Sequence, residues 1–156
     1  MAFSGSSSYL KHAIVSYCNE AKVNILNVCP TVIEQHSEVS LQCVAQMAIG
    51  AARLVSDSRV DSNTTYSADY AIATSGMAGP TGTEQIPVGT VVIAVLAHNK
   101  VYSQKIAISS SRSRNYIRDL TVAVALDMLR RAILGKDPIA QYGYIKATEQ
   151  NVLEIE

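Results

Sequence analysis

The chain has few of the residues that mark disulfide-rich, zinc-binding or nucleic-acid-binding proteins. It holds three cysteines, Cys18, Cys29 and Cys43, and no two of them are spaced as Cys-x-x-Cys. A disulfide framework or a zinc site is therefore not expected, and a reducing compartment is the natural inference. Thirteen basic residues balance thirteen acidic ones, so no net charge attracts nucleic acid or an anionic membrane.

Long apolar runs and targeting signals are also missing. The longest apolar run is well short of the roughly 20 residues that a membrane helix needs. Residues 1–8 lack the charged and apolar regions of a signal peptide. The three histidines, His12, His36 and His98, are scattered along the chain. We expect a soluble, cytoplasmic protein with no metal site, no cofactor, no nucleic-acid partner and no membrane contact.

The chain is rich in the residues that build a compact interior. Hydrophobic residues make up 48% of the 156 residues and charged residues 17%, which is less than the usual quarter for charged residues. This length suits one domain with a single core. Gly135 is a typical helix C-cap and Pro138 a typical stop, so we expect the domain to span residues 1–135 and a tail to span residues 136–156.

A glycine-rich loop between two apolar runs is the most distinctive stretch. Residues 70–74 and 88–97 are short and rich in β-branched residues, which favours strands. Residues 75–83 hold three glycines and a proline, and glycines let backbone N–H groups approach an anion closely. No Gly-Lys-Ser/Thr or dinucleotide fingerprint follows. The residues alone indicate an anion-friendly loop, and a connection that merely turns a corner is the alternative.

Helix and strand signals alternate along the rest of the chain. Residues 56–67 are polar and lack periodicity, so we expect a surface loop there. His98 and Asn99 are typical of a tight hairpin turn. From periodicity and caps we expect helices at residues 19–28, 31–36, 41–55 and 114–134, and strands at residues 12–17, 70–74, 88–97 and 100–108, with a tail or small strand at 142–145.

This order predicts an α/β fold of three layers, α/β/α, with a mixed β-sheet. Ligands in such folds bind beyond the carboxyl ends of the strands. Residues 17–22, 75–83 and 109–114 each follow a predicted strand. We therefore expect these three polar segments to converge on one pocket.

Several of these segments resemble one family, the C-terminal domain of the competence/damage-inducible protein CinA, also called the nicotinamide-nucleotide amidase family. The resemblance covers residues 5–134 in one order. It lies in Gly5-Ser6-Ser7-Ser8-Tyr9, Tyr17-Cys18-Asn19-Glu20-Ala21-Lys22, His36-Ser37-Glu38-Val39-Ser40, Ser75-Gly76-Met77-Ala78-Gly79-Pro80, Pro87-Val88-Gly89-Thr90-Val91, and Arg114 with Arg118. Arg112 and Ser113 replace the Gly-Asp that the family has before these arginines.

The resemblance implies a CinA C-terminal-like fold and a reaction. The reaction is hydrolysis of the carboxamide of nicotinamide mononucleotide to nicotinic acid mononucleotide and ammonia by a Ser/Lys mechanism, without a metal. The family's nucleophilic serine lies in an N-terminal Glu-Ser-Cys-Thr-Gly-Gly segment, after a first helix and strand. That motif does not occur in these 156 residues, so relative to the family the domain is truncated at its N-terminus.

Three residues match catalytic positions of the family. Lys22 matches the general base, although a lysine on a short polar helix is ordinarily a solvated surface residue. Tyr17 matches a tyrosine that relays a proton or orients Lys22, with an ordinary packed aromatic as the alternative. Ser7 matches a second serine that donates to the developing oxyanion, although serine-rich termini are by default disordered.

The remaining matches imply substrate binding. Arg114 and Arg118 lie one helical turn apart and are expected to hold the phosphate together with the helix N-terminus, with a solvated basic face as the alternative. The residues that the resemblance places around the rest of the nucleotide are Ser6, Asn19, Ser75, Gly76 and Gly79.

Three functional interpretations remain open at this point. The first is an amidase whose nucleophile comes from sequence outside these residues. The second is a non-catalytic member that binds a pyridine nucleotide or acts as an assembly partner, and the third is an α/β scaffold that binds nothing. Loss of the family's first strand and helix would leave a bare sheet edge and an apolar face, so we expect a homo-oligomer.

Overall fold

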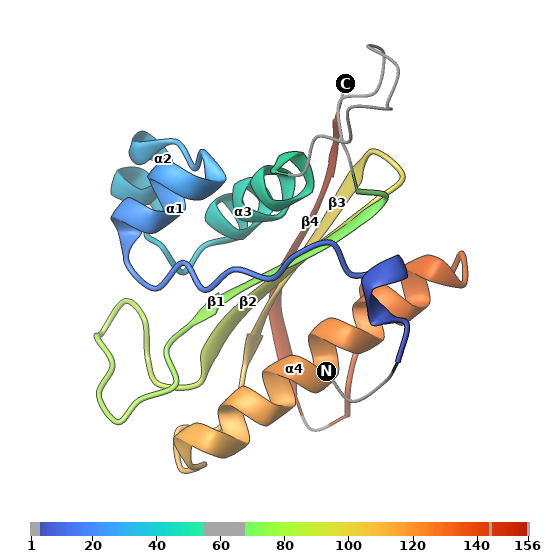
Figure 1. Ribbon diagram of the computed structural model, residues 1–156. Coiled ribbons are helices and arrows are strands. Elements are labelled where there is room, and N and C mark those ends of the chain that lie inside the picture. Colours follow the sequence, from blue (N-terminus) through green and yellow to red (C-terminus); the bar gives the residue numbers. More distant parts are fainter. Residues whose placement is uncertain (1–3, 55–67, 144, 156) are drawn as a thin grey trace.

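The computed structural model describes residues 4–54, 68–143 and 145–155. The predicted surface loop at residues 56–67 lies outside the described residues. Within them the chain forms helices on both faces of one β-sheet (Figure 1). No helix in the described part of the chain is long and apolar enough to cross a membrane.

The sheet has four strands in the order β1-β2-β3-β4, and each neighbouring pair is antiparallel. The predicted turn at His98 and Asn99 is confirmed: both residues have positive φ, 49° and 62°, which matches the twist of a two-residue hairpin. The strands are β1 (Tyr70–Gly76), β2 (Thr90–Ala97), β3 (Lys100–Ala107) and β4 (Lys146–Glu154).

Two long helices cover the two faces of the sheet. α3 (Leu41–Arg53) contacts β1, β2 and β3, whereas α4 (Arg114–Ile133) contacts β1 and β2 from the other face. Ser40 caps α3 as predicted, because its hydroxyl accepts the N–H of Cys43 at 3.1 Å. The shorter elements are the 3₁₀ turn η1 (Ser6–Ser8), α1 (Asn19–Leu26) and α2 (Pro30–His36). The predicted three-layer α/β fold is confirmed.

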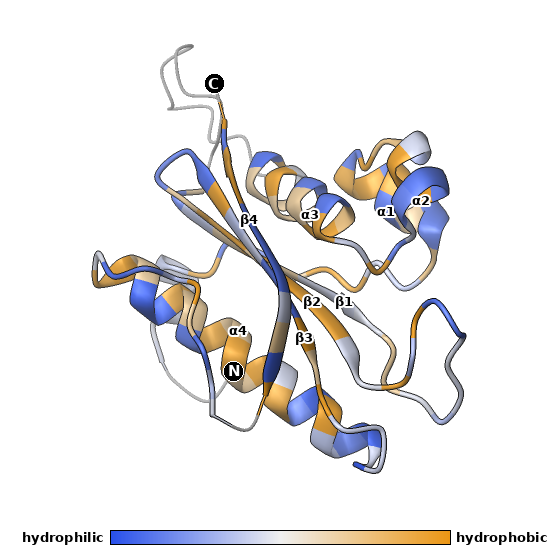
Figure 2. Cartoon of the chain, turned by 180° about the vertical axis from the view of Figure 1, so that it is seen from behind, coloured by the Kyte–Doolittle hydropathy of each residue, from blue (hydrophilic) through white to orange (hydrophobic). Residues whose placement is uncertain are grey.

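The strand β2 lies at the centre of the protein and is buried on both faces. The buried side chains form one hydrophobic core on each face of the sheet. Val92, Ala94 and Leu96 belong to the core under α3, and Val91 and Ile93 belong to the core under α4. Successive side chains of a strand point to opposite faces, so a strand covered twice needs an unbroken apolar run. This explains the hydrophobic band along β2 (Figure 2).

Two sequence expectations about strands were wrong. Residues 12–17 form no strand: Val15 and Tyr17 are 87% and 85% exposed, and no ladder joins this segment to the described sheet. Without a parallel strand there, the expected mixed sheet is antiparallel throughout the described strands.

The tail contributes more to the sheet than expected. Residues 146–154 form β4 beside β3, while Tyr142 and Ile145 make only an isolated bridge. Ion pairs join Lys100 to Glu154 at 2.7 Å and Lys105 to Glu149 at 2.9 Å across the two strands. The residues that pair between β3 and β4 are far apart in sequence. β4 itself is mostly polar, so it lacks the apolar pattern that would predict a strand.

The short helix α1 packs against α3 at a glycine. A Cβ atom built on Gly50 would collide with the backbone carbonyl of Leu26, the last residue of α1. A side chain at this position would push the two helices apart. Gly50 therefore sets how closely α1 approaches the core.

We predict that Gly50→Ala destabilises the protein by about 1–3 kcal/mol, the usual cost of overpacking a tight interior. Chemical denaturation followed by circular dichroism measures this change. Gly143→Ala is the matched control, because a Cβ at Gly143 has no atom within 4 Å. Equal stability of the two variants would show that α1 does not depend on close contact with α3.

Candidate functional site

Lys22 is buried, although its helix is short and polar. Only 5% of the residue is exposed, and its Nζ donates a hydrogen bond to the carbonyl oxygen of Ser16 at 3.1 Å. A fully buried lysine is rare. The surface interpretation of Lys22 is therefore wrong.

The charge of the Lys22 amine acts on a buried thiol, that of Cys43. Cys43, in the first turn of α3, is fully buried, and burial raises the pKa of its thiol to about 11 even though the charge of Lys22 acts in the opposite direction. At neutral pH the Cys43 thiol stays protonated. The thiol therefore adds no negative charge near Lys22, and the sequence gives no signal for this electrostatic coupling between distant positions.

Ser75 lies on the same face of the sheet as Lys22. Along β1, Ala71 and Ala73 pack into the core under α3, and the two-residue period of a strand places Ser75 on that face. α1, which carries Lys22, packs against α3. The carboxyl end of β1 and the Lys22 helix therefore share one face of the sheet.

The loop after β1 is closed by its own backbone. The N–H of Met77 donates to the carbonyl of Thr90 at 2.8 Å, and the N–H of Gly89 donates to the carbonyl of Met77 at 2.7 Å. Gly79, inside this loop, has φ 85°, a conformation that favours glycine. The loop is thus held in a fixed shape beyond the end of the strand.

Arg114 joins this loop to the start of α4. Its Nη1 donates to the carbonyl oxygen of Gly79 at 2.6 Å, and Ser113 caps the helix by accepting the N–H of Tyr116 at 3.2 Å. Arg118 follows one turn later and is exposed. A helix N-terminus carries partial positive charge and free N–H groups, so two arginines beside it make a place suited to a phosphate.

The guanidinium of Arg112 lies over the Tyr116 ring, 4.9 Å from its centre. Arg112 stands where the family has a glycine. The cation–π contact fixes this third positive charge close to the same helix start.

The N-terminal matches lie elsewhere. Ser6 and Ser7 are in η1, and an extended segment separates this turn from α1 (Figure 1). Tyr17 is 85% exposed at the end of that segment, and Asn19 is the exposed first residue of α1. Among the matched residues, the structure joins Arg114 to Gly79 and places Ser75 on the face of Lys22, but it leaves η1 apart from Lys22.

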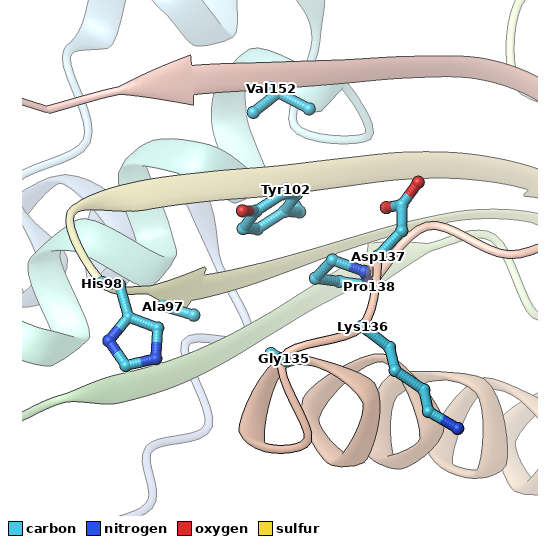
Figure 3. Close-up of a pocket in the computed structure, with 9 residues that line it drawn as sticks. Ala97, His98, Tyr102, Gly135, Lys136, Asp137, Pro138 and Val152 are labelled. Carbon is cyan, nitrogen blue, oxygen red and sulfur yellow. The ribbon is translucent and has the colours of Figure 1, made fainter.

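A shallow cavity of about 370 Å³ lies at the other end of α4 (Figure 3). The hairpin turn after β2 and the segment after α4 form its walls, with Tyr102 and Val152 from β3 and β4. It contains none of the residues matched above. Among the described residues, no cluster of three or more histidine, cysteine or acidic side chains is arranged to hold a metal ion.

Comparison with known proteins shows the family of the chain. A model of the CinA C-terminal domain matches residues 1–133. A CinA-like protein of Shewanella halifaxensis is 48% identical over 151 residues, which cover 96% of this chain and 33% of that protein. The nicotinamide-nucleotide amidohydrolase PncC of Shewanella oneidensis is 48% identical over 141 residues, or 90% of this chain and 30% of that protein. The chain thus spans about a third of the length of these curated relatives.

Solved structures show the same fold. The competence damage-inducible protein A (ComA) of Klebsiella pneumoniae superposes with a TM-score of 0.71 at 28% identity, over 85% of this chain and 75% of that one. The competence/damage inducible protein CihA of Agrobacterium tumefaciens gives a TM-score of 0.65 at 33% identity, over 76% of this chain and 66% of that one. The chain belongs to the CinA C-terminal domain family.

Proposed function

We propose that this chain is the core of an amidase that hydrolyses nicotinamide mononucleotide to nicotinic acid mononucleotide and ammonia. The observation that carries the proposal is the burial of Lys22, at the position of the family's general base. A relative that is 48% identical is named nicotinamide-nucleotide amidohydrolase, which supports a small-molecule substrate. We place the protein in the cytoplasm, in pyridine nucleotide metabolism, as a homo-oligomer.

Lys22 would act as the base in a serine-dependent hydrolysis. A serine hydroxyl attacks the carboxamide carbon while Lys22 accepts the hydroxyl proton. Lys22 then gives this proton to the leaving amino group, which departs as ammonia, and water cleaves the acyl-enzyme. The Ser16 carbonyl fixes the position of the amine, and none of the ion pairs among the described residues involves Lys22. The serine would come from sequence outside these 156 residues.

The nucleotide would lie between the loop after β1 and the start of α4. Arg114, Arg118 and the helix N-terminus would bind its phosphate, and the backbone of Ser75, Gly76 and Gly79 would contact the rest. The bond between Arg114 and Gly79 supports this, because it joins the two parts of the binding site. On the family resemblance we also assign Ser7 and Tyr17 to catalysis, and Ser6 and Asn19 to substrate binding.

The second candidate is a non-catalytic member that binds a pyridine nucleotide or serves as an assembly partner. The absence of a Glu-Ser-Cys-Thr-Gly-Gly motif from these residues favours it. The two candidates share the binding site and differ only in turnover.

We predict little or no ammonia release from nicotinamide mononucleotide by this chain alone, and turnover once the upstream family segment is joined to it. In that extended protein, Lys22→Met should lower kcat by about 10²–10⁴-fold, because a general base is lost. Lys11→Met, at an exposed lysine, is the matched control. Turnover by these 156 residues alone that Lys22→Ala abolishes would indicate another nucleophile, with Ser6 or Ser7 tested first.

We predict that Arg114→Ala weakens binding of nicotinamide mononucleotide by about tenfold to a hundredfold, since a charged hydrogen bond to phosphate is lost. Titration calorimetry measures the affinity, and nicotinamide riboside, which lacks the phosphate, should bind equally to both proteins. Arg130→Ala, near the other end of α4, is the control. An equal loss for nucleotide and riboside would assign Arg114 to loop structure alone.

A further inference from the structure

The middle of the loop after β1 is held by a residue from a distant part of the chain. Backbone hydrogen bonds fix the base of this loop at Met77 and a turn near its tip at Thr83. Residues 78–82 take part in none of these bonds. Within the described chain, the hydrogen bond that reaches them runs from the Arg114 Nη1 to the Gly79 carbonyl at 2.6 Å. The hydrogen bonding of this segment therefore depends on Arg114.

The Arg114 guanidinium has donors left over after this bond. A guanidinium carries five N–H groups in a rigid fork, and the bond to Gly79 uses the Nη1 nitrogen. Arg114 is exposed at the first residue of α4, so a ligand can reach its other nitrogens from solvent. One side chain can thus hold the loop and a phosphate at the same time.

A phosphate on this guanidinium would strengthen its bond to the loop. Ordering a long, exposed side chain costs rotamer entropy, which offsets much of what one hydrogen bond contributes. A phosphate bound to Arg114 and Arg118 fixes the side chain, so the bond to Gly79 then forms without that cost. The loop continues directly from Ser75, on the sheet face that also carries the Lys22 helix. Order in the loop is therefore transmitted toward the place of the proposed reaction.

We propose that Arg114 is a positioning residue that couples phosphate binding to the order of residues 78–82, so that a bound phosphate raises the affinity of the site for nicotinamide riboside. Preference for a phosphorylated nucleotide then comes from loop order as well as from contacts with the phosphate. Arg118 differs, because no hydrogen bond or ion pair within the described residues joins it to the loop. This inference rests on the proposed function, since it concerns the same nucleotide site.

Titration calorimetry with the nucleotide supplied in two pieces tests the coupling. Nicotinamide riboside is titrated into the chain with and without saturating inorganic phosphate, at an ionic strength kept equal with chloride. We expect phosphate to lower the riboside Kd about five- to tenfold, which is within the usual range for coupled sites. A riboside Kd that phosphate leaves unchanged, or raises by competition, overturns the proposal.

Two variants separate the coupling from simple phosphate binding. Arg114→Lys keeps a positive charge but lacks the fork that holds two partners, so phosphate should still bind without lowering the riboside Kd. Arg118→Ala should raise the Kd of phosphate itself, yet keep the full effect on the riboside once phosphate is saturating. Arg130→Ala, near the other end of α4, should behave like the unchanged chain. Coupling that survives Arg114→Lys and disappears in Arg118→Ala contradicts the role given to Arg114.

Amide hydrogen exchange gives a readout that needs no riboside. Phosphate alone should slow exchange at residues 78–82 in the unchanged chain and not in Arg114→Lys. Equal exchange with and without phosphate overturns the proposal, even where the riboside binds too weakly for calorimetry. The amidase proposal fails by a different result, the absence of ammonia release from the extended protein. Ammonia release without any phosphate effect on the riboside or on exchange refutes the coupling alone.

Discussion

The close contact between α1 and α3 determines the site. Gly50 leaves no space between its own Cα and the backbone of Leu26, so α1 lies directly on α3. This contact carries Lys22 into the interior, where the Ser16 carbonyl holds its amine and the Cys43 thiol stays neutral. The chemistry proposed for the chain therefore follows from helix packing rather than from the polarity of α1.

The sheet supplies the second half of the site. β2 is buried on both faces, which fixes β1 beside it and fixes the loop that follows β1. That loop is then joined to the start of α4 by Arg114. A rigid centre thus positions a glycine-containing loop and a helix N-terminus together, an arrangement suited to an anionic ligand.

Much of the fold follows from local sequence signals. A few neighbouring residues are enough to predict three features: the cap at Ser40 before α3, the His98-Asn99 turn and the buried strand β2. Residues 12–17 show the limit of such signals, because an apolar pattern does not tell whether a neighbouring strand is present. β4 was missed for the converse reason: it depends on β3, far away in sequence.

The site was less predictable than the fold. The burial of Lys22 has no signal in the polar sequence of α1, and only the family resemblance singled it out. The contact between Gly79 and Arg114 was anticipated in outline, because both segments follow strands. The separation of η1 from Lys22 was not anticipated, because no local pattern predicts the path of an extended segment that joins no strand.

Amine labelling with and without nicotinamide mononucleotide, read by mass spectrometry, tests the central claim most directly. If Lys22 lies inside a nucleotide site, it reacts more slowly than any other lysine of the chain, and the nucleotide slows it further while Lys11 and Lys146 are unaffected. Labelling of Lys22 as fast as that of Lys11, or a rate that the nucleotide leaves unchanged, would contradict the account.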